Sequence, residues 1–227
     1  MEIIAEIGHN WNGDIALARQ MIWRAKDCGA DTAKFQLYDV DKLPGIEPGS
    51  PIYWELKTSQ LTYYQLEDLI NECKKAEIKF LCSVFDPERV EWTEALNVER
   101  YKIASRSIND KDLIRAIALT GKPIIASLGM WDKKEFPDFK ADFLYCIAKY
   151  PPKDEDLKDF PEKFDKYTGF SDHTIGTKWA KLAIDKGAKI IEKHFTLDKE
   201  MVGCDQAGSA DEKELKEIVN YGRKHSN

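Results

Sequence analysis

The sequence predicts an α/β protein that folds as a single (β/α)8 TIM barrel over residues 1–227. Three observations lead to this prediction: eight short apolar runs, amphipathic stretches between them, and no Pro/Gly/Ser-rich linker that would divide the chain. Near-continuous apolar runs are typical of parallel strands that are covered on both faces. Eight strand–helix units of roughly 28 residues each are long enough for a compact barrel.

The expected strands are rich in β-branched and aromatic residues, and most of them end in polar residues. Because the runs are separated by helical patterns and not by tight turns, a parallel arrangement is favoured over hairpins. The strands are expected at residues 3–7, 32–37, 79–84, 101–104, 123–127, 143–148, 168–171 and 189–195.

Helices are expected where apolar residues recur at a spacing of three and four. Residues 62–75 begin with Thr62 and carry Gln65 three positions later, which is the pattern of a capping box. Pro137 makes the segment after the fifth strand the weakest helix candidate. Residues 38–60 show no periodicity and predict a long loop over the C-terminal end of the barrel. The other helices are expected at residues 14–27, 87–96, 110–119, 177–186 and 211–223.

The composition excludes several classes of protein. Lys and Arg number 34 and Asp and Glu number 40, so the net charge is −6, which disfavours nucleic acid or an anionic membrane as partner. No apolar run approaches the ~18 residues of a membrane span, and the N-terminus lacks a signal-peptide pattern. The five cysteines are odd in number and form no C-x-x-C pair. We therefore expect a cytoplasmic protein with unpaired thiols.

Polar residues gather at the C-terminal ends of the expected strands, where barrels of this class carry their chemistry. In chain order these candidates are Glu6, His9, Asn10, Lys34, Gln36, Ser83, Lys102, Ser105, Ser127, Tyr150, Ser171, His173, Glu192 and His194, followed by Asp205 and Ser209 from the loop after the last strand.

Two lysines inside apolar strands are the first informative feature. Lys34 and Lys102 should be largely buried, which is costly without an anionic partner. With Ser105 and Ser127 nearby, they suit the binding of a phosphate or a carboxylate. The alternative is that each lysine pairs with a structural carboxylate such as Glu6 or Glu192.

Two histidines are the second feature. His173 and His194 end neighbouring expected strands, whose ends lie ~5 Å apart, so the two imidazoles can share one divalent ion. Asp205 or Glu6 can complete an octahedral site with water, which suits Mn²⁺ or Mg²⁺ better than tetrahedral zinc. The alternative is that the histidines are ordinary core residues.

In these residues the chain resembles the sialic acid synthase (N-acetylneuraminate synthase) family. The matching segments run in order along nearly the whole chain. They are IAEIG at 4–8, AKFQ at 33–36, YKIAS at 101–105, SLGM at 127–130, Cys146 with Tyr150 and Pro151, FSDHT at 170–174, IEKHFTLD at 191–198 and GCD at 203–205.

The resemblance implies an enzyme that condenses phosphoenolpyruvate with an N-acetylated aldose, giving a nonulosonic 2-keto sugar acid and phosphate. It implies His173 and His194 as metal ligands, and Glu6, Lys34, Lys102 and Asp205 as catalytic residues, with Glu6 as the candidate for proton transfer. The expected substrate-binding residues are Asn10, Gln36, Ser83, Ser105, Ser127, Tyr150, Ser171 and Ser209.

The chain also departs from the family pattern. Family members usually carry a C-terminal antifreeze-like domain that caps the site, and we expect this chain to lack it. Trp11 stands where the family has His, Ala148 replaces an Asn, and Cys204 replaces a Pro; Arg106 and Ser107 replace a Gly-Glu pair. Donor and metal positions are thus kept while sugar-side positions change. This pattern predicts an altered acceptor, or an acceptor site completed in trans by a separate capping domain.

Two other functions stay open. One is a different barrel aldolase or lyase, in which a strand lysine forms a Schiff base with a keto acid. The other is a non-catalytic, partner-dependent subunit that binds a sugar phosphate. A homodimer through the barrel faces is compatible with each of these functions.

Overall fold

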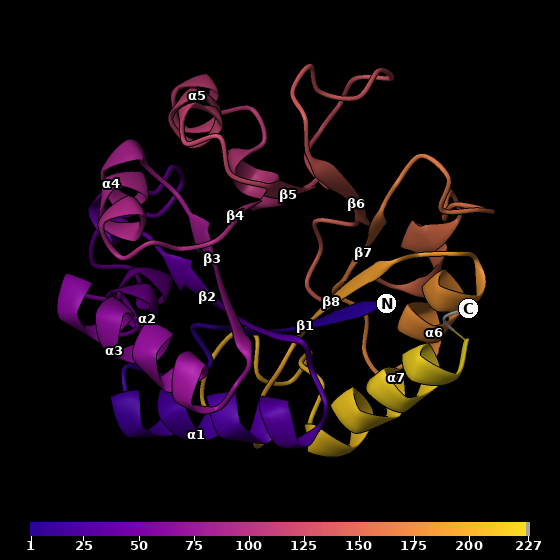
Figure 1. Cartoon of the computed structure of the whole chain (residues 1–227), viewed down its shortest axis with the longest axis horizontal. Helices are drawn as coiled ribbons and strands as arrows, with labels where there is room; N and C mark the ends of the chain where they lie inside the picture. Colours follow the sequence, from indigo (N-terminus) through magenta and orange to yellow (C-terminus); the bar gives the residue numbers. More distant parts are fainter. Residues whose placement is uncertain (226–227) are drawn as a thin grey trace.

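The computed structural model describes residues 1–225, and its eight parallel strands close into one barrel in the order in which they occur in the chain. Figure 1 shows the helices arranged around this barrel. The barrel closes where Glu2 to Glu6 of the first strand pair with Ile190 to His194 of the last. The prediction of a (β/α)8 barrel is confirmed. The strands are β1(Glu2–Gly8), β2(Thr32–Leu37), β3(Lys79–Val84), β4(Tyr101–Ile103), β5(Ile124–Ser127), β6(Asp142–Cys146), β7(Gly169–Asp172) and β8(Ile190–His194).

The predicted helices are all present, with ends that differ by a few residues. The capping box is confirmed: Thr62 Oγ1 accepts from the Gln65 backbone N–H, and the Gln65 side chain accepts from that of Thr62. The α-helices are α1(Ile15–Asp27), α2(Pro51–Thr58), α3(Tyr63–Lys75), α4(Pro87–Ala95), α5(Lys111–Leu119), α6(Lys178–Asp185) and α7(Glu212–His225), and the 3₁₀ turns are η1(Val40–Lys42), η2(Ser105–Ser107) and η3(Asp154–Leu157).

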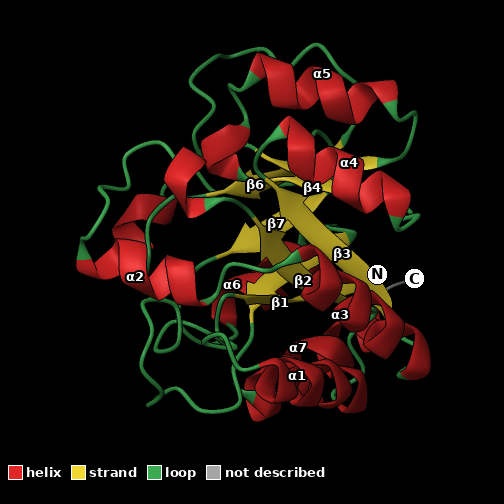
Figure 2. Cartoon of the chain, turned by 90° about the vertical axis from the view of Figure 1, so that its left-hand side faces the viewer, coloured by secondary structure: helices red, strands yellow, loops and turns green. Residues whose placement is uncertain are grey.

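The prediction of an unbroken loop over residues 38–60 is wrong. This segment contains η1 and α2, because Ser50 caps α2 through its hydroxyl and Pro51 occupies the first turn, where its missing N–H costs nothing. Tyr38, Val40, Leu43 and Leu56 pack into a small apolar cluster of their own. In Figure 2 the termini lie at the right and α2 at the left, so α2 covers the C-terminal end of the barrel.

The interior of the barrel alternates between an apolar and a polar layer. The apolar layer is Ile4, Leu81, Ile125, Leu144 and Ile190. Since strand side chains alternate between two faces, residues two positions later point into the barrel again, one layer nearer its C-terminal end. Those residues are Glu6, Ser83, Ser127, Cys146 and Glu192. The period of two therefore sets a layer of polar groups on an apolar floor.

Between β5 and β7, the described chain forms no α-helix, and aromatic side chains cover the outside of the strands instead. Phe136 packs against Phe143 with ring centroids 5.2 Å apart, and Phe160 packs against both Tyr145 and Phe170. These edge-on contacts bury the outer face of β6 and β7 as helices do elsewhere. The weak helix prediction around Pro137 agrees with this outcome. Within residues 1–225 there is no helix with the length and apolar character of a membrane span.

Candidate active site at the C-terminal end of the barrel

The polar layer surrounds a hollow of about 310 Å³ at the C-terminal end of the barrel. Strands from the whole circumference contribute to it, so the closed sheet fixes the positions of its side chains. The lining residues are Glu6, Lys34, Gln36, Ser83, Lys102, Ala104, Ser105, Ser127, Tyr150, Ser171, His173, Glu192 and His194. The structure thus brings together most of the residues that the sequence singled out.

Lys34 is buried and forms the tightest ion pair of the hollow. Its Nζ lies 2.6 Å from Glu6 Oε2, and it donates a 3.1 Å hydrogen bond to Ser83 Oγ. Gln36 donates to the other oxygen of Glu6 at 2.9 Å. Burial alone would lower the pKa of Lys34, but the carboxylates of Glu192 and Glu6 raise it. The pairing of a strand lysine with Glu6, which the sequence offered as an alternative, is therefore present.

Lys102 has a different environment. Its Nζ donates to Ser127 Oγ at 2.7 Å and to the Ile103 carbonyl at 3.1 Å, while the Glu192 carboxylate stays 3.7 Å away. Burial lowers the pKa of Lys102, and the positive charge of Lys34 acts in the same direction. An anionic ligand in the hollow would stabilise the charged form of this lysine.

Glu192 lies between the two lysines, as the second of the two structural carboxylates that the sequence offered as their partners. Its Oε2 is 3.6 Å from Lys34 Nζ, and its Oε1 accepts a 2.8 Å hydrogen bond from Ser171. Burial raises the pKa of Glu192, but Lys102 and Lys34 outweigh this effect and hold it at about 2. Glu192 is ionised at neutral pH, and the lysine-in-strand pattern was the signal that such a carboxylate had to exist.

A second network joins Ser105 to the histidines. The Gly129 N–H donates to Ser105 Oγ at 3.1 Å, and Ser105 donates to Cys146 Sγ at 3.3 Å. A Cβ at Gly129 would lie 2.9 Å from that hydroxyl, so only glycine lets the backbone approach. Cys146 Sγ in turn lies 3.9 Å from His173 Nδ1. Cys146, which the sequence analysis named in a family segment but not among the candidate site residues, thus connects Ser105 to His173.

His173 and His194 face each other with ring centroids 5.7 Å apart, and Tyr150 stacks on His173 at 4.2 Å. His173 Nδ1 lies 2.9 Å from the Ile147 carbonyl, so Nδ1–H donates there and Nε2 is the nitrogen that can bind a ligand on losing its proton. Burial would lower the pKa of His173, but Cys146 and the Ile147 carbonyl raise it to about 9. Burial lowers the pKa of His194.

The pair fits a divalent cation. His194 Nδ1 is buried and has no hydrogen-bond partner among residues 1–225, and Asp205 Oδ2 lies 3.5 Å from it. An unpaired buried imidazole nitrogen is costly unless something outside the protein engages it. With the free nitrogen of His173 and a carboxylate nearby, the donor set matches the N and O ligands of Mn²⁺ or Mg²⁺.

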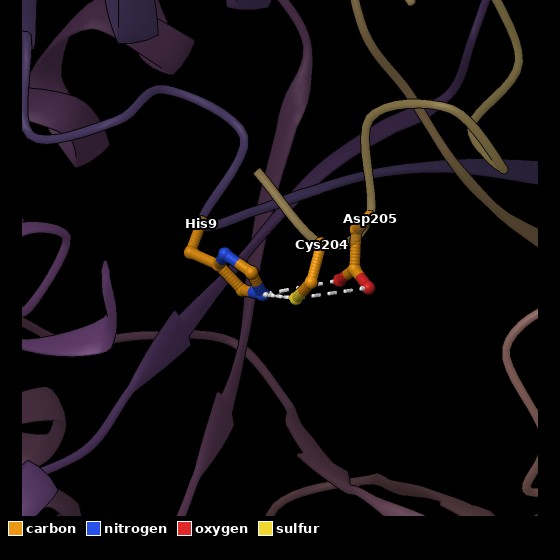
Figure 3. A group of neighbouring side chains, drawn as sticks. All are labelled: His9, Cys204 and Asp205. Carbon is orange, nitrogen blue, oxygen red and sulfur yellow. Dashed lines mark hydrogen bonds and ion pairs between the residues drawn. The ribbon is translucent and has the colours of Figure 1, made fainter. Parts of the chain in front are cut away.

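Asp205 forms the outer wall of the site together with His9. Asp205 Oδ2 lies 3.1 Å from His9 Nε2, and Figure 3 shows the carboxylate and the imidazole edge facing Cys204. Burial raises the pKa of Asp205, but His194 and His9 bring it well below the ordinary value of an aspartate. Burial lowers the pKa of His9, but the contact with Asp205 outweighs this effect, so the pKa of His9 is raised.

Asn10 and Ser209 lie behind this wall, and neither residue lines the hollow between the lysines. Asn10 Nδ2 donates to Ser209 Oγ and to the Phe195 carbonyl, both at 2.9 Å, and Ser209 donates to the Asp205 carbonyl at 2.7 Å. These bonds tie the loop after β8 to the loop after β1. The contacts of Asn10 and Ser209 position Asp205. The role of these two residues in substrate binding stays a prediction.

A second hollow of about 480 Å³ opens on the other side of the two histidines. It shares Tyr150, His173 and His194 with the first and has a mostly apolar lining. The remaining lining residues are Pro151, Ile175, Cys204, Asp205, Ala207 and Gly208. The two hollows therefore meet at the histidine pair, with the lysines on one side and Asp205 on the other.

This chain belongs to the class of TIM-barrel enzymes, since it is a parallel barrel whose C-terminal end carries buried lysines, carboxylates and paired histidines. Residues 21–227 match the NeuB family. The chain is 37% identical over 233 residues to an uncharacterized protein of Methanocaldococcus jannaschii, covering 96% of this chain and 68% of that protein. It is 33% identical over 251 residues to N,N'-diacetyllegionaminic acid synthase of Legionella pneumophila, covering 96% of this chain and 70% of that protein.

Among solved structures, the sialic acid synthetase of Leptospira borgpetersenii serovar Hardjo-bovis superposes with a TM-score of 0.88 at 30% identity, covering 98% of this chain and 82% of that one. The chain therefore belongs to the NeuB family. The resemblance drawn from its motifs is confirmed, and so is the expectation that the protein is an enzyme.

Proposed function

We propose that this enzyme condenses phosphoenolpyruvate with an N-acetylated aldose, releasing phosphate and forming a nonulosonic 2-keto sugar acid. One observation carries the proposal: two buried lysines and four serine hydroxyls line a hollow that adjoins a pair of histidines. The named relatives that make legionaminic, pseudaminic and sialic acids support it. In this proposal, residues 1–227 act as one catalytic barrel domain in the cytoplasm, where the five free thiols would stay reduced.

The donor would occupy the hollow between the lysines. Phosphoenolpyruvate carries a phosphate and a carboxylate, and charge-assisted hydrogen bonds are the strongest means of holding both. Lys102 is the main candidate for this role, because no carboxylate lies within hydrogen-bond distance of its Nζ. Ser105, Ser127 and Ser171 supply neutral donors around it, while Lys34 is engaged by Glu6.

The acceptor aldehyde would lie at the histidine pair. His173 and His194, with Asp205 or Glu6, would hold Mn²⁺ or Mg²⁺, which supplies Lewis-acid polarisation of the aldehyde oxygen. C3 of the donor attacks the aldehyde carbon, water adds at C2, and phosphate leaves by C–O cleavage. The lysines offset the anionic charge throughout, and Glu6, between Lys34 and Gln36, is placed to move a proton.

The sugar itself would extend into the second hollow. Tyr150 and Ile175 are more than half exposed at its rim, so a capping domain contributed in trans would complete the site and shield it from water. This arrangement, or a homodimer that covers the same rim, would make activity partner-dependent. Trp11 is fully buried and lines neither hollow, which fits an acceptor different from that of family members with a histidine there.

Phosphate release from phosphoenolpyruvate tests this proposal. The enzyme, with Mn²⁺ and a panel of aldoses that includes N-acetylmannosamine, should release phosphate only when both the metal and one sugar are present. Lys102→Met should strongly slow release, whereas Lys122→Met should not, because Lys122 precedes β5 at the other end of the barrel, where it pairs with Glu94.

The alternative functions give different results. Covalent trapping of pyruvate by borohydride on Lys34 or Lys102 would favour an aldolase or lyase. A different outcome is that the enzyme binds phosphoenolpyruvate but releases no phosphate with any sugar, even when a capping domain is added. That result would favour a non-catalytic subunit and reject the synthase.

A further inference from the structure

Three side chains of metal-ligand type meet at the rim of the barrel from segments nearly 200 residues apart. His9 follows β1, and Cys204 and Asp205 lie in the loop after β8. His9 Nε2 is 3.1 Å from Asp205 Oδ2 and 3.8 Å from Cys204 Sγ, and Cys204 Sγ is 3.7 Å from Asp205 Oδ1. Figure 3 shows the imidazole edge, the sulfur and the carboxylate converging on one point.

These distances match the edges of a tetrahedral coordination sphere. Bonds of about 2.0–2.1 Å to nitrogen and oxygen and of about 2.3 Å to sulfur give ligand–ligand separations of roughly 3.3–3.7 Å. His9 Nε2 lies within a few tenths of an ångström of this range both from Cys204 Sγ and from Asp205 Oδ2, and one ligand atom from each residue lies within 4.8 Å of the other two. A cation can therefore bind here with little movement of the side chains.

A carboxylate holds the ligands from behind. Glu55, on α2, has Oε1 3.6 Å from His9 Nδ1, and the same oxygen accepts a 2.8 Å hydrogen bond from the Cys204 backbone N–H. A carboxylate that engages the far nitrogen of a ligating histidine fixes the tautomer of the ring and its orientation. Glu55 thus holds the backbone of Cys204 by a hydrogen bond and places a negative charge beside His9.

An unsatisfied nitrogen of the histidine pair lies next to the cluster. His194 is nine-tenths buried, and its Nδ1 has no hydrogen-bond partner among the described residues. This nitrogen lies 3.5 Å from Asp205 Oδ2. A cation held by Asp205 would bring a positive charge within reach of this lone pair.

We propose that His9, Cys204 and Asp205 form a binding site for a thiophilic divalent cation such as Zn²⁺, distinct from the His173/His194 pair. Thiolate selects Zn²⁺ or Co²⁺ over Mg²⁺, since soft ligands favour these ions. On binding, the thiol proton of Cys204 passes to solvent and a sulfur–metal bond forms. Asp205 belongs to both centres, so the new site adjoins the proposed acceptor side.

The test uses the metal-free full chain and Co²⁺ or Zn²⁺ alone, without any substrate. A Co²⁺ titration should produce a thiolate-to-cobalt charge-transfer absorption that excess Mg²⁺ leaves unchanged. Cys204→Ser should abolish this absorption, and His9→Gln should weaken binding. Glu55→Gln should weaken it by about 10–100-fold, as expected for loss of an orienting carboxylate.

Two controls keep the result specific. Cys28→Ser should retain the absorption, because Cys28 is a buried thiol whose hydrogen bond to the Glu212 carbonyl a serine can reproduce. His173→Gln should also retain it, which separates this site from the histidine pair of the proposed function. Circular dichroism verifies the fold, and Cys204 is exposed, so its substitution leaves the core intact.

The proposal is overturned if the wild-type protein shows no thiolate absorption with Co²⁺, if the absorption persists in Cys204→Ser, or if His9→Gln binds Co²⁺ as the wild type does. Since no donor or acceptor is present, these outcomes are independent of whether the enzyme condenses phosphoenolpyruvate.

Discussion

Ser127 Oγ accepts a 2.7 Å hydrogen bond from Lys102 Nζ across the neighbouring strands β4 and β5. This bond holds the ammonium group at the hollow, while Glu192 lies beyond hydrogen-bond distance. The charge of Lys102 is thereby positioned by a neutral group and remains open to an anion.

The first prediction concerns this lysine. Lys102→Met should lower kcat/KM for phosphoenolpyruvate by about 10²–10³-fold, the range found for the loss of one preorganised charge-stabilising donor. Ser127→Ala should cause a smaller decrease, because the lysine keeps its charge and loses only its positioning. Steady-state kinetics of phosphate release provides the measurement, and equal kinetics in Lys102→Met and the wild type would contradict the assignment.

The second prediction concerns stability in acid. The pKa of Glu192 is about 2 in the folded state and 4.5 in an ordinary glutamate. Its contribution to the free energy of unfolding is therefore complete above pH 4.5 and is lost as the pH falls toward 2. Glu192→Gln should flatten the pH dependence in that window and cost about 3–5 kcal/mol at pH 7, because two lysines lose their shared partner. Urea unfolding at several pH values tests both effects.

The third prediction concerns His173 in the metal-free protein. Its pKa of about 9 lies above the ordinary 6.5, so protonation stabilises the fold fully below pH 6.5 and this contribution disappears as the pH rises through 9. Cys146→Ser should lower the pKa of His173, because the sulfur that raises it is replaced by a hydroxyl that does not ionise in this pH range. A histidine titration followed by NMR gives the value directly, and an unchanged pKa in the variant would show that Cys146 is not the cause.

The fourth prediction concerns the apolar floor of the barrel. Leu144→Ala should lower the free energy of unfolding by about 2–5 kcal/mol, since it opens a cavity in a layer that is closed on all sides. Leu119→Ala is the matched control: Leu119 ends α5 and is 79% exposed, so its loss should change stability by less than about 0.5 kcal/mol. Denaturant unfolding distinguishes the two, and a similar small effect for both would mean that the floor is loosely packed.

The barrel and its polar layer were predictable because they follow from local periodicity. Every strand was located from a run of apolar residues, and the candidates at the strand ends share one hollow because side chains on a strand alternate with a period of two. Lys34 and Lys102 were informative since a buried charge requires a partner. The sequence offered both Glu6 and Glu192 as partners and did not rank them, because both glutamates sit in strands as buried as those of the lysines.

The rim of the site was much less predictable. Its geometry depends on α2, which reaches across the end of the barrel and brings Glu55 to His9 and Cys204. No local pattern links positions 9, 55 and 204, and the short helix was hidden in a segment with three prolines. The N-cap at Ser50 followed by Pro51 was the one local signal that marked this helix.

The closed order of the strands has a thermal consequence. Glu6, Lys34, Lys102 and Glu192 stand on four different strands of one continuous ring, so no local opening separates them, and they disperse only when the whole domain melts. The cluster of His9, Cys204 and Asp205 rests on loops and on one short helix. On heating, its spectroscopic signature should therefore fade first, well below the temperature at which the domain itself gives way.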